Sequence, residues 1–170
     1  MFRLKRMLGL FLMNHMFVGT RFFQVKRYLA RFAGFQVGTN VSIVGPISVG
    51  NICKVHIGDN CWLGKDMKIY GNGSVFIANN VDVAPNVSFF TGGHEIGGPQ
   101  RRAGKGLRYE IIIKNGCWIG GSVSLFNNIT INEGVVIGLG SVVNKSCNKN
   151  CVYAGNPAKV VRRLDPEGFY

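Results

Sequence analysis

The residues best suited to acid–base chemistry lie in one glycine-rich, basic segment, TGGHEIGGPQRRAGKGLRYE, at residues 91–110. His94 stands beside Glu95 in this segment. Four cations follow them: Arg101, Arg102, Lys105 and Arg108. An imidazole titrates near neutral pH, so a positioned histidine can remove a proton from an attacking hydroxyl. The segment alone leaves two alternatives for His94, a general base or an inert surface side chain.

The element that must position this segment is a repeat, because an apolar residue returns at every sixth position over long parts of the chain. These positions are Val37, Ile43, Val49, Ile57, Leu63, Ile69, Ile77, Val83, Phe89, Ile113, Ile119, Leu125, Ile131, Ile137 and Val143. Such a period is typical of a parallel β-helix, in which each hexapeptide forms a short strand and a corner and three hexapeptides make one triangular coil. We therefore predict an all-β fold with about five coils over residues 37–148, stabilised mainly by apolar burial along its axis.

The repeat is interrupted at three places that fall at the same point of the coil. The spacing rises to eight residues before Ile57 and Ile77, and to twenty-four before Ile113. Each interruption follows the third side of a coil, so all three stack along one edge. Residues 91–110 therefore form a long loop with fixed ends, which is typical of a functional element.

The same register predicts two outward columns of side chains. The first column is aromatic: Tyr70, Phe90 and Phe126. It suits either subunit packing or a stabilising ladder, since exposed aromatic side chains are a liability on a monomer. The second column places Asp82 between Trp62 and Trp118, and this carboxylate is either solvated or orients a catalytic group.

Charge is distributed unevenly along the chain. There are 20 basic and 8 acidic residues, a formal net charge of +12, and no acidic residue precedes Asp59. Seven cations crowd the first 31 residues: Arg3, Lys5, Arg6, Arg21, Lys26, Arg27 and Arg31. This gradient predicts a negatively charged partner near the N-terminus, and on charge alone nucleic acid, an anionic membrane or a phosphorylated substrate would fit.

Residues 1–36 precede the repeats and are predicted to form a basic, amphipathic helical segment. Two sets of apolar residues share spacings of three and four. They are Leu4, Met7, Leu8 and Phe11, and Phe22, Val25, Leu29 and Phe32. The longest apolar run, residues 7–13, is far below the roughly twenty residues needed to span a bilayer. The segment either caps the first coil or packs on a neighbouring subunit, or residues 1–32 lie on an anionic membrane.

The five cysteines do not indicate a disulfide framework, because their number is odd and Cys61 and Cys117 fall on inward repeat positions. Free thiols favour a reducing cytoplasm. Cys147 and Cys151 lack a companion pair with zinc-like spacing, so no metal site is predicted. Residues 149–170 are expected to form a C-terminal cap with a short helix, either as a polar cap or as a phosphate-binding tail.

Several segments together resemble the left-handed β-helix acyltransferases: the hexapeptide repeats, TGGHE, WIGGSVSL and VVNKSCNKNCVYAGNPAKVVRRL. The resemblance covers residues 37–164 and is nearest to the maltose, galactoside and surface-polysaccharide O-acetyltransferases. It implies a left-handed parallel β-helix, a homotrimer with active sites between adjacent prisms, and acetyl-CoA as co-substrate. It also implies no metal and no nucleic-acid partner.

Position by position, the resemblance implies roles for residues of this chain. His94 matches the catalytic histidine, with Glu95 or Asp82 as the group that would orient its ring. Trp118 matches a tryptophan near the acceptor, and Asp82 and Asn86 are expected to join it in substrate binding. Coenzyme binding is expected of Gly120, Ser122, Gly138, Ser141, Lys145, Asn156, Pro157, Lys159 and Arg162. The chain departs from the family in reading NKSCNKN where many relatives have threonine-lysine-aspartate followed by prolines.

The resemblance and the basic N-terminal segment together favour O-acetylation of a sugar hydroxyl in the synthesis of exopolysaccharide, capsule or O-antigen. We expect a cytoplasmic enzyme, with the inner membrane face as a site of peripheral contact. Two alternatives use the same chemistry: N-acetylation of an amino sugar and O-acetylation of serine. A β-helical carbonic anhydrase is more distant, since it needs three histidine ligands around zinc and only His56 and His94 lie outside the predicted helix.

Overall fold

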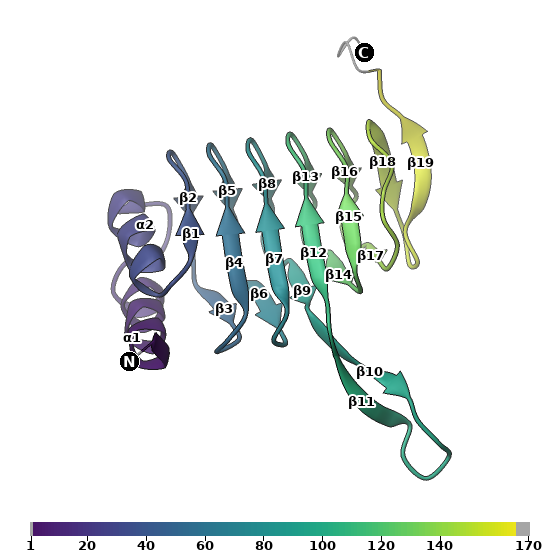
Figure 1. The fold of residues 1–170 in the computed structure, drawn as a ribbon. Helices are drawn as coiled ribbons and strands as arrows, with labels where there is room; N and C mark the ends of the chain where they lie inside the picture. The colour runs from purple at the N-terminus through teal and green to yellow at the C-terminus, as the bar shows by residue number, and fades with distance from the viewer. Residues whose placement is uncertain (1, 166–170) are drawn as a thin grey trace.

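The fold is a triangular β-solenoid closed at one end by two helices (Figure 1). The computed structural model describes residues 2–165. Met1 and residues 166–170, the outer ends of the first and last predicted segments, lie outside the described residues. Helix α1 spans Phe2–His15 and helix α2 spans Phe23–Phe32. The helices stand at one end of the solenoid and the C-terminal strands at the other (Figure 1).

Three sheets form the sides of the solenoid, and each of the first five coils contributes one strand to each sheet. The first sheet contains β1 (Gln36–Val37), β4 (Lys54–Ile57), β7 (Ser74–Ile77), β12 (Glu110–Ile113) and β15 (Ile129–Ile131). The second contains β2 (Ser42–Ile43), β5 (Trp62–Leu63), β8 (Asp82–Val83), β13 (Trp118–Ile119), β16 (Val136–Ile137), β18 (Cys151–Ala154) and β19 (Lys159–Arg163). The third contains β3 (Ile47–Val49), β6 (Met67–Tyr70), β9 (Ser88–Phe90), β14 (Ser124–Phe126) and β17 (Val142–Val143). A hairpin of β10 (Gly92–Ile96) and β11 (Ala103–Arg108) stands apart from these sheets.

The strand register confirms the six-residue repeat. On the first side Ile57 pairs with Ile77, and Ile77 pairs with Ile113 across the long interruption. Leu63 pairs with Val83 on the second side, and the third side follows the same rule. All five side chains are at most 1% exposed. Because the same position of every coil points inward, stacked aliphatic side chains exclude water along the axis.

The C-terminal segment differs from the prediction in two ways. β18 pairs in parallel with β16, placing Tyr153 beside Ile137, so the solenoid has about six turns rather than five. The predicted short helix is wrong, because Lys159–Arg163 forms β19, which pairs antiparallel with β18. Without β19 the last strand would expose an unpaired backbone edge, and the β-branched Val160 and Val161 favour an extended chain.

The predicted N-terminal helical segment consists of two helices, and together they cover the open end of the first coil. Met13, Leu29 and Ala30 join the hydrophobic core. The helices approach closely at Gly9, where a Cβ would lie 2.9 Å from the carbonyl oxygen of Leu29. In the described part of the chain, no helix has the length and apolar content to cross a membrane.

Two buried cations bind backbone carbonyls at this end of the solenoid. Arg6 donates from Nη1 to the carbonyl oxygens of Gly50 and Cys53, both at 2.9 Å. Lys26 donates from Nζ to the carbonyl oxygen of Val44 at 3.1 Å. Desolvation by burial lowers the pKa of both Arg6 and Lys26. These two charges therefore hold the cap together rather than adding to the exposed basic surface.

Candidate active site

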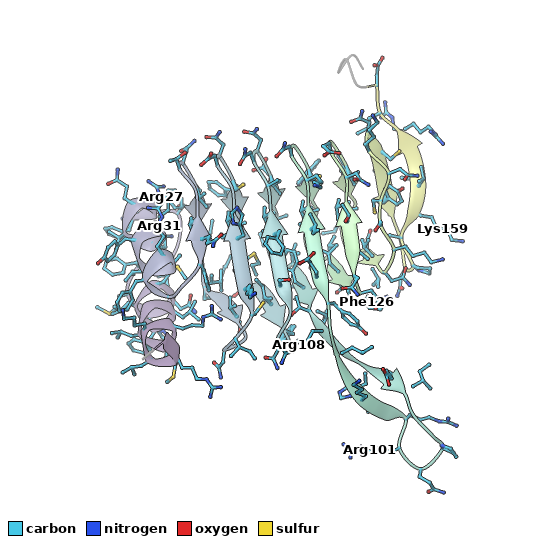
Figure 2. The ribbon with its side chains drawn as sticks, in the orientation of Figure 1. Arg27, Arg31, Arg101, Arg108, Phe126 and Lys159 are labelled. Atoms are coloured by element: carbon cyan, nitrogen blue, oxygen red, sulfur yellow. The ribbon has the colours of Figure 1, made fainter. Side chains whose placement is uncertain are left out.

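His94 lies on a β-hairpin that leaves the solenoid at the edge between the third and first sides (Figure 1). The long loop predicted at residues 91–110 is ordered as β10 and β11, whose register pairs Gly92 with Arg108 and His94 with Gly106. Arg108 lies near the base of the hairpin and Arg101 near its far end (Figure 2). The hairpin extends away from the prism, so it carries His94 outside the prism's sheets.

A backbone carbonyl decides which nitrogen of the His94 ring is protonated. Nδ1 lies 2.9 Å from the carbonyl oxygen of Gly104. That oxygen can only accept, so in the neutral ring Nδ1 carries the proton and Nε2 is left as a base. Within residues 2–165 no hydrogen bond joins the ring to Glu95 or Asp82. Gly104 therefore supplies the contact predicted for a carboxylate, and the roles of Glu95 and Asp82 stay predictions.

A pocket of about 490 Å³ opens beside His94. Its walls come from three segments, residues 70–72, 92–94 and 106–108. Glycine keeps one wall close to its neighbour, because a Cβ on Gly93 would lie 2.5 Å from the hydroxyl oxygen of Tyr109. A side chain at position 93 would therefore have to displace the Tyr109 ring, which packs against this wall of the pocket.

Two residues of this pocket, Tyr70 and Asn72, were not predicted as site residues. Tyr70 stacks on Phe90 with ring centroids 5.2 Å apart, and Phe126 follows on the next coil, which confirms the register of the aromatic column. Asn72 lies among the extra residues before Ile77, at the edge where the hairpin also leaves. The eight-residue spacing there is the signal that could have identified it.

The predicted column of two indoles and a carboxylate is present on the second side. Asp82 pairs with Trp62 on one neighbouring strand and with Trp118 on the other. The two indoles are 40% and 56% exposed, respectively. Phe23 of α2 packs edge-on against Trp62, with ring centroids 5.8 Å apart. The column thus offers apolar ring faces beside a negative charge on an open surface.

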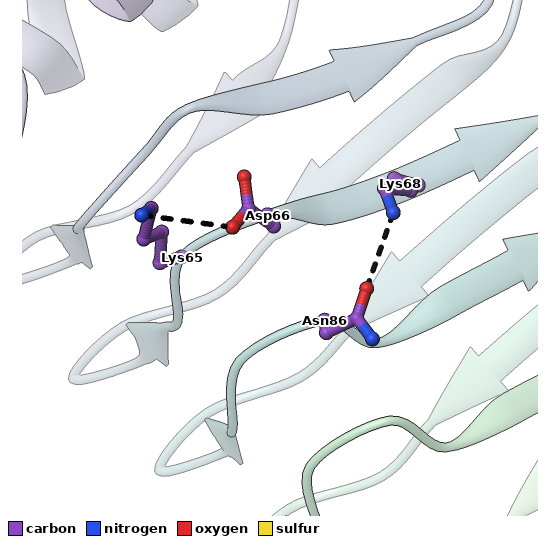
Figure 3. Close-up of polar contacts among 4 residues, drawn as sticks. All are labelled: Lys65, Asp66, Lys68 and Asn86. Atoms are coloured by element: carbon purple, nitrogen blue, oxygen red, sulfur yellow. Dashed lines mark hydrogen bonds and ion pairs between the residues drawn. The ribbon is translucent and has the colours of Figure 1, made fainter.

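Asn86, predicted to bind substrate, lies at a corner of the solenoid (Figure 3). It has φ 61°, and Ser122 repeats that conformation on the next coil with φ 56°. The Asn86 side chain donates to the Ser122 hydroxyl and accepts from Lys68 Nζ, both at 3.1 Å. One coil earlier the ion pair of Lys65 and Asp66 spans 3.9 Å (Figure 3). These contacts give Asn86 and Ser122 roles in the corner, while their ligand contacts stay predictions.

The predicted coenzyme-binding residues Gly120 and Gly138 stack along the edge between the second and third sides. A Cβ on Gly120 would lie 2.6 Å from the carbonyl oxygen of Ile137, and one on Gly138 would lie 3.1 Å from Cβ of Ala154. The absence of a Cβ therefore lets neighbouring coils stack closely at this edge, and no side chain from these two positions stands between the backbone and a ligand. We name this edge the glycine strip. The tail turn at residues 155–158 continues directly from it.

The remaining residues predicted to bind the coenzyme divide into two groups. Ser141 is fully buried, and its hydroxyl donates to the carbonyl oxygen of Gly138 and accepts from the N–H of Gly155. Its hydroxyl therefore holds the turn, and a ligand could meet only the neighbouring backbone. The others are exposed at or beyond the last coil: Lys145, Asn156, Pro157, Lys159 and Arg162.

Leu139 is a candidate that the prediction missed. It is 79% exposed, and its backbone nitrogen lies 2.8 Å from the position of a Cβ on Gly120. An apolar side chain on the glycine strip could cover the aliphatic part of a ligand. Its signal in the sequence is an apolar residue at a corner, a position otherwise held by small or polar residues.

One chain does not bring the two parts of the predicted site together. His94 and its pocket lie at the edge between the third and first sides, and none of the predicted coenzyme-binding residues lines that pocket. The glycine strip lies at a different edge, between the second and third sides.

The cysteines are poor candidates for a covalent intermediate. All five are free and buried, as the sequence predicts for Cys61 and Cys117. Desolvation raises the pKa of Cys117 to about 11 and that of Cys147 to about 12. Since the thiolate is the reactive form, these thiols are inert at neutral pH.

Comparison with known proteins identifies relatives, although no model of a known protein family matches the sequence. The chain is 34% identical to galactoside O-acetyltransferase of Escherichia coli K12 over 129 residues, which cover 76% of this chain and 64% of that enzyme. It is 30% identical to WcaF of the same organism, named as a colanic acid biosynthesis acetyltransferase, over 143 residues that cover 84% of this chain and 77% of WcaF. A solved structure of galactoside acetyltransferase in complex with coenzyme A has a TM-score of 0.82 and 29% identity, covering 98% of this chain and 82% of that chain.

The structural match covers nearly the whole chain. The chain spans less than two thirds of the galactoside enzyme but more than three quarters of WcaF. On sequence and fold together, the chain belongs to the hexapeptide-repeat acetyltransferases.

Proposed function

We propose that the chain is an acetyl-CoA-dependent O-acetyltransferase that modifies a sugar hydroxyl. The observation that carries the proposal is the His94 ring, whose Nδ1 is bound to the Gly104 carbonyl while Nε2 remains available beside a pocket of about 490 Å³. Further support comes from relatives named for galactoside O-acetylation and colanic acid biosynthesis, and from a related structure that holds coenzyme A.

In the proposed reaction, Nε2 of His94 accepts the proton of the acceptor hydroxyl while the hydroxyl oxygen attacks the thioester carbonyl. Backbone N–H groups stabilise the resulting oxyanion. When the C–S bond breaks, the imidazolium returns the proton to the leaving sulfur, and the coenzyme departs as a free thiol. The Gly104 carbonyl stabilises the imidazolium through its Nδ1 proton. No acyl-enzyme is required, which agrees with the inert cysteines.

The proposal includes a homotrimer in which the hairpin of one subunit faces the glycine strip of the next. A closed three-fold ring would pair every His94 with a strip, which one chain alone does not do. The strip would hold the pantetheine arm, and Lys145, Lys159 and Arg162 would form charge-assisted hydrogen bonds with coenzyme phosphates. Left-handed winding, as in the family that the chain resembles, belongs to the same proposal.

For the acceptor, we propose a glycan of a surface polysaccharide. The column of Trp62, Asp82 and Trp118 supports a sugar, because indole faces can cover the apolar face of a pyranose while a carboxylate accepts from its hydroxyls. Such a precursor, if carried on a lipid, would be modified in the cytoplasm at the inner membrane face.

The test is a screen of acceptors with the full chain and acetyl-CoA, measured as free thiol. We expect thiol release that depends on lysate-derived glycans, nucleotide sugars or maltose, and that is lost in His94→Ala. Faster release with amino sugars or serine would favour those acceptors instead. A protein that releases no thiol with any acceptor, or that hydrates CO₂ when loaded with zinc, would overturn the proposal.

A further inference from the structure

Helix α1 packs on the solenoid with the face that carries fewer large apolar residues. Arg6, Gly9 and Met13 follow one another at spacings of three and four, and all three are buried. They contact the first coil and α2, as the hydrogen bonds of Arg6 and the close approach at Gly9 show.

The opposite face of α1 is a stripe of large apolar side chains. We name it the outer stripe, and its members are Leu4, Met7, Leu8 and Phe11. Their exposed fractions are 68%, 63%, 47% and 55%, respectively. At 100° per residue the centre of this stripe lies about 180° from the packed face. It therefore points away from α2 and the first coil, at the end of the solenoid that the helices cover (Figure 1).

Exposed apolar residues also continue beyond α1. They are Met16, Val18, Phe22, Val25 and Tyr28. Scattered surface apolar residues are ordinary, but four large ones on one face of a helix, as in the outer stripe, mark an interaction site. The helical cap thus exposes apolar side chains on α1, on the connecting segment and on α2.

The charge of the helical cap indicates which kind of partner would bind the outer stripe. No acidic residue occurs before Asp59, so the whole helical cap lacks a carboxylate side chain. Arg3 and Lys5 are exposed and flank the outer stripe on its two sides at helical spacing, and Arg21 is exposed in the connecting segment. A second copy docked on this surface would face like charges across the contact. An anionic membrane surface would complement both the apolar side chains and the positive charges of the cap.

We propose that the outer stripe is a membrane-contact surface that inserts into the interfacial region of an anionic phospholipid bilayer, with α1 lying in the plane of the headgroups. Apolar side chains on one face, flanked by cations that reach lipid phosphates, are the features of an interfacial helix. The inference deepens the proposed function and rests on it, because the membrane contact would hold the enzyme where lipid-carried glycans are found. In a trimer of parallel prisms, three stripes would face the same membrane and bind it together.

The test is flotation of the full chain with phospholipid vesicles. Phosphatidylcholine vesicles containing about one quarter phosphatidylglycerol are compared with phosphatidylcholine alone. We expect the protein to float with the anionic vesicles and to stay behind with the neutral ones. Leu8→Glu with Phe11→Glu should lower the bound fraction on the order of tenfold or more, because two inserted side chains become anionic. The matched control is Val161→Glu, at an exposed apolar site on β19 at the other end of the solenoid.

A second pair of variants tests the charge. Arg3→Gln with Lys5→Gln should weaken binding to anionic vesicles, whereas Lys65→Gln with Lys114→Gln, which removes the same charge elsewhere, should not. Equal binding to neutral vesicles, or no binding by the wild type, would overturn the proposal. So would a stripe variant that still floats but sediments as a smaller assembly, because the stripe would then be a contact between copies. His94→Ala should float like the wild type, so failure of the membrane proposal and failure of the catalytic proposal are distinguishable.

Discussion

Complementation between two inactive variants tests the shared site directly. His94→Ala removes the base from the hairpin, and Gly138→Trp fills the glycine strip, where even a Cβ would lie 3.1 Å from Ala154 Cβ. The two positions lie at different edges of the prism. If each active site takes its base from one subunit and its strip from the next, a mixed trimer contains sites in which both parts are intact.

The size of the expected rescue follows from the geometry. Loss of a positioned base should leave at most about 1% of the activity, and a blocked strip should do the same by excluding the coenzyme. In randomly mixed trimers at equal amounts, a given site receives its hairpin from the Gly138→Trp subunit and its strip from the His94→Ala subunit in about one quarter of cases. Activity should therefore rise from about 1% to about 25% of the wild type.

The assay is thiol release from acetyl-CoA after the variants have been mixed, partly dissociated and reassembled. Subunit exchange is verified with a charge-tagged copy, and the size of each assembly is measured by sedimentation. No gain in activity despite demonstrated exchange, or full activity in a sedimenting monomer, would refute the shared site. Gly138→Ala serves as a milder control, since its side chain should leave most of the strip open.

Three further predictions concern single residues. His94→Ala should lower kcat/KM about 10²- to 10⁴-fold while leaving acetyl-CoA affinity, measured by calorimetry, nearly unchanged. Ser141→Ala should lower the free energy of unfolding by about 1 to 3 kcal/mol, because the hydrogen bonds to Gly138 and Gly155 are lost inside the protein; the exposed Ser48→Ala is the control in thermal unfolding. Burial raises the pKa of Cys147 from 9.0 to about 12, so the unfolded chain loses this proton at lower pH than the folded protein. Stability should then fall as pH rises from about 9 toward about 12, and urea unfolding of Cys147→Ala should show a smaller fall.

The sequence was sufficient to predict the solenoid because residues that contact each other between coils are set by their spacing in the chain. Ile57, Ile77 and Ile113 stack on one another although they are far apart in the chain, since each occupies the same position of its coil. The same rule predicted the column of Trp62, Asp82 and Trp118 and the edge from which the hairpin leaves. In a solenoid, counting residues is enough to know which side chains are neighbours.

Features that depend on unpaired backbone groups could not be predicted by counting residues. β19 forms because the last strand leaves an open edge, although the segment was predicted as a helix. The His94 ring is held by the carbonyl of Gly104 across the hairpin, a group that every residue carries and that no residue type marks. The Ser141 hydroxyl is likewise bound inside its turn.

The helical cap shows most clearly what the sequence determines and what the tertiary structure determines. The sequence alone determined that Leu4, Met7, Leu8 and Phe11 share one face of a helix, because that follows from 3.6 residues per turn. Only the tertiary structure decided that this face points outward, because the close approach at Gly9 and the carbonyls that Arg6 satisfies turn the other side of the helix toward the solenoid. Periodicity specifies which side chains lie together on a helix, and the packing partner decides which way they face.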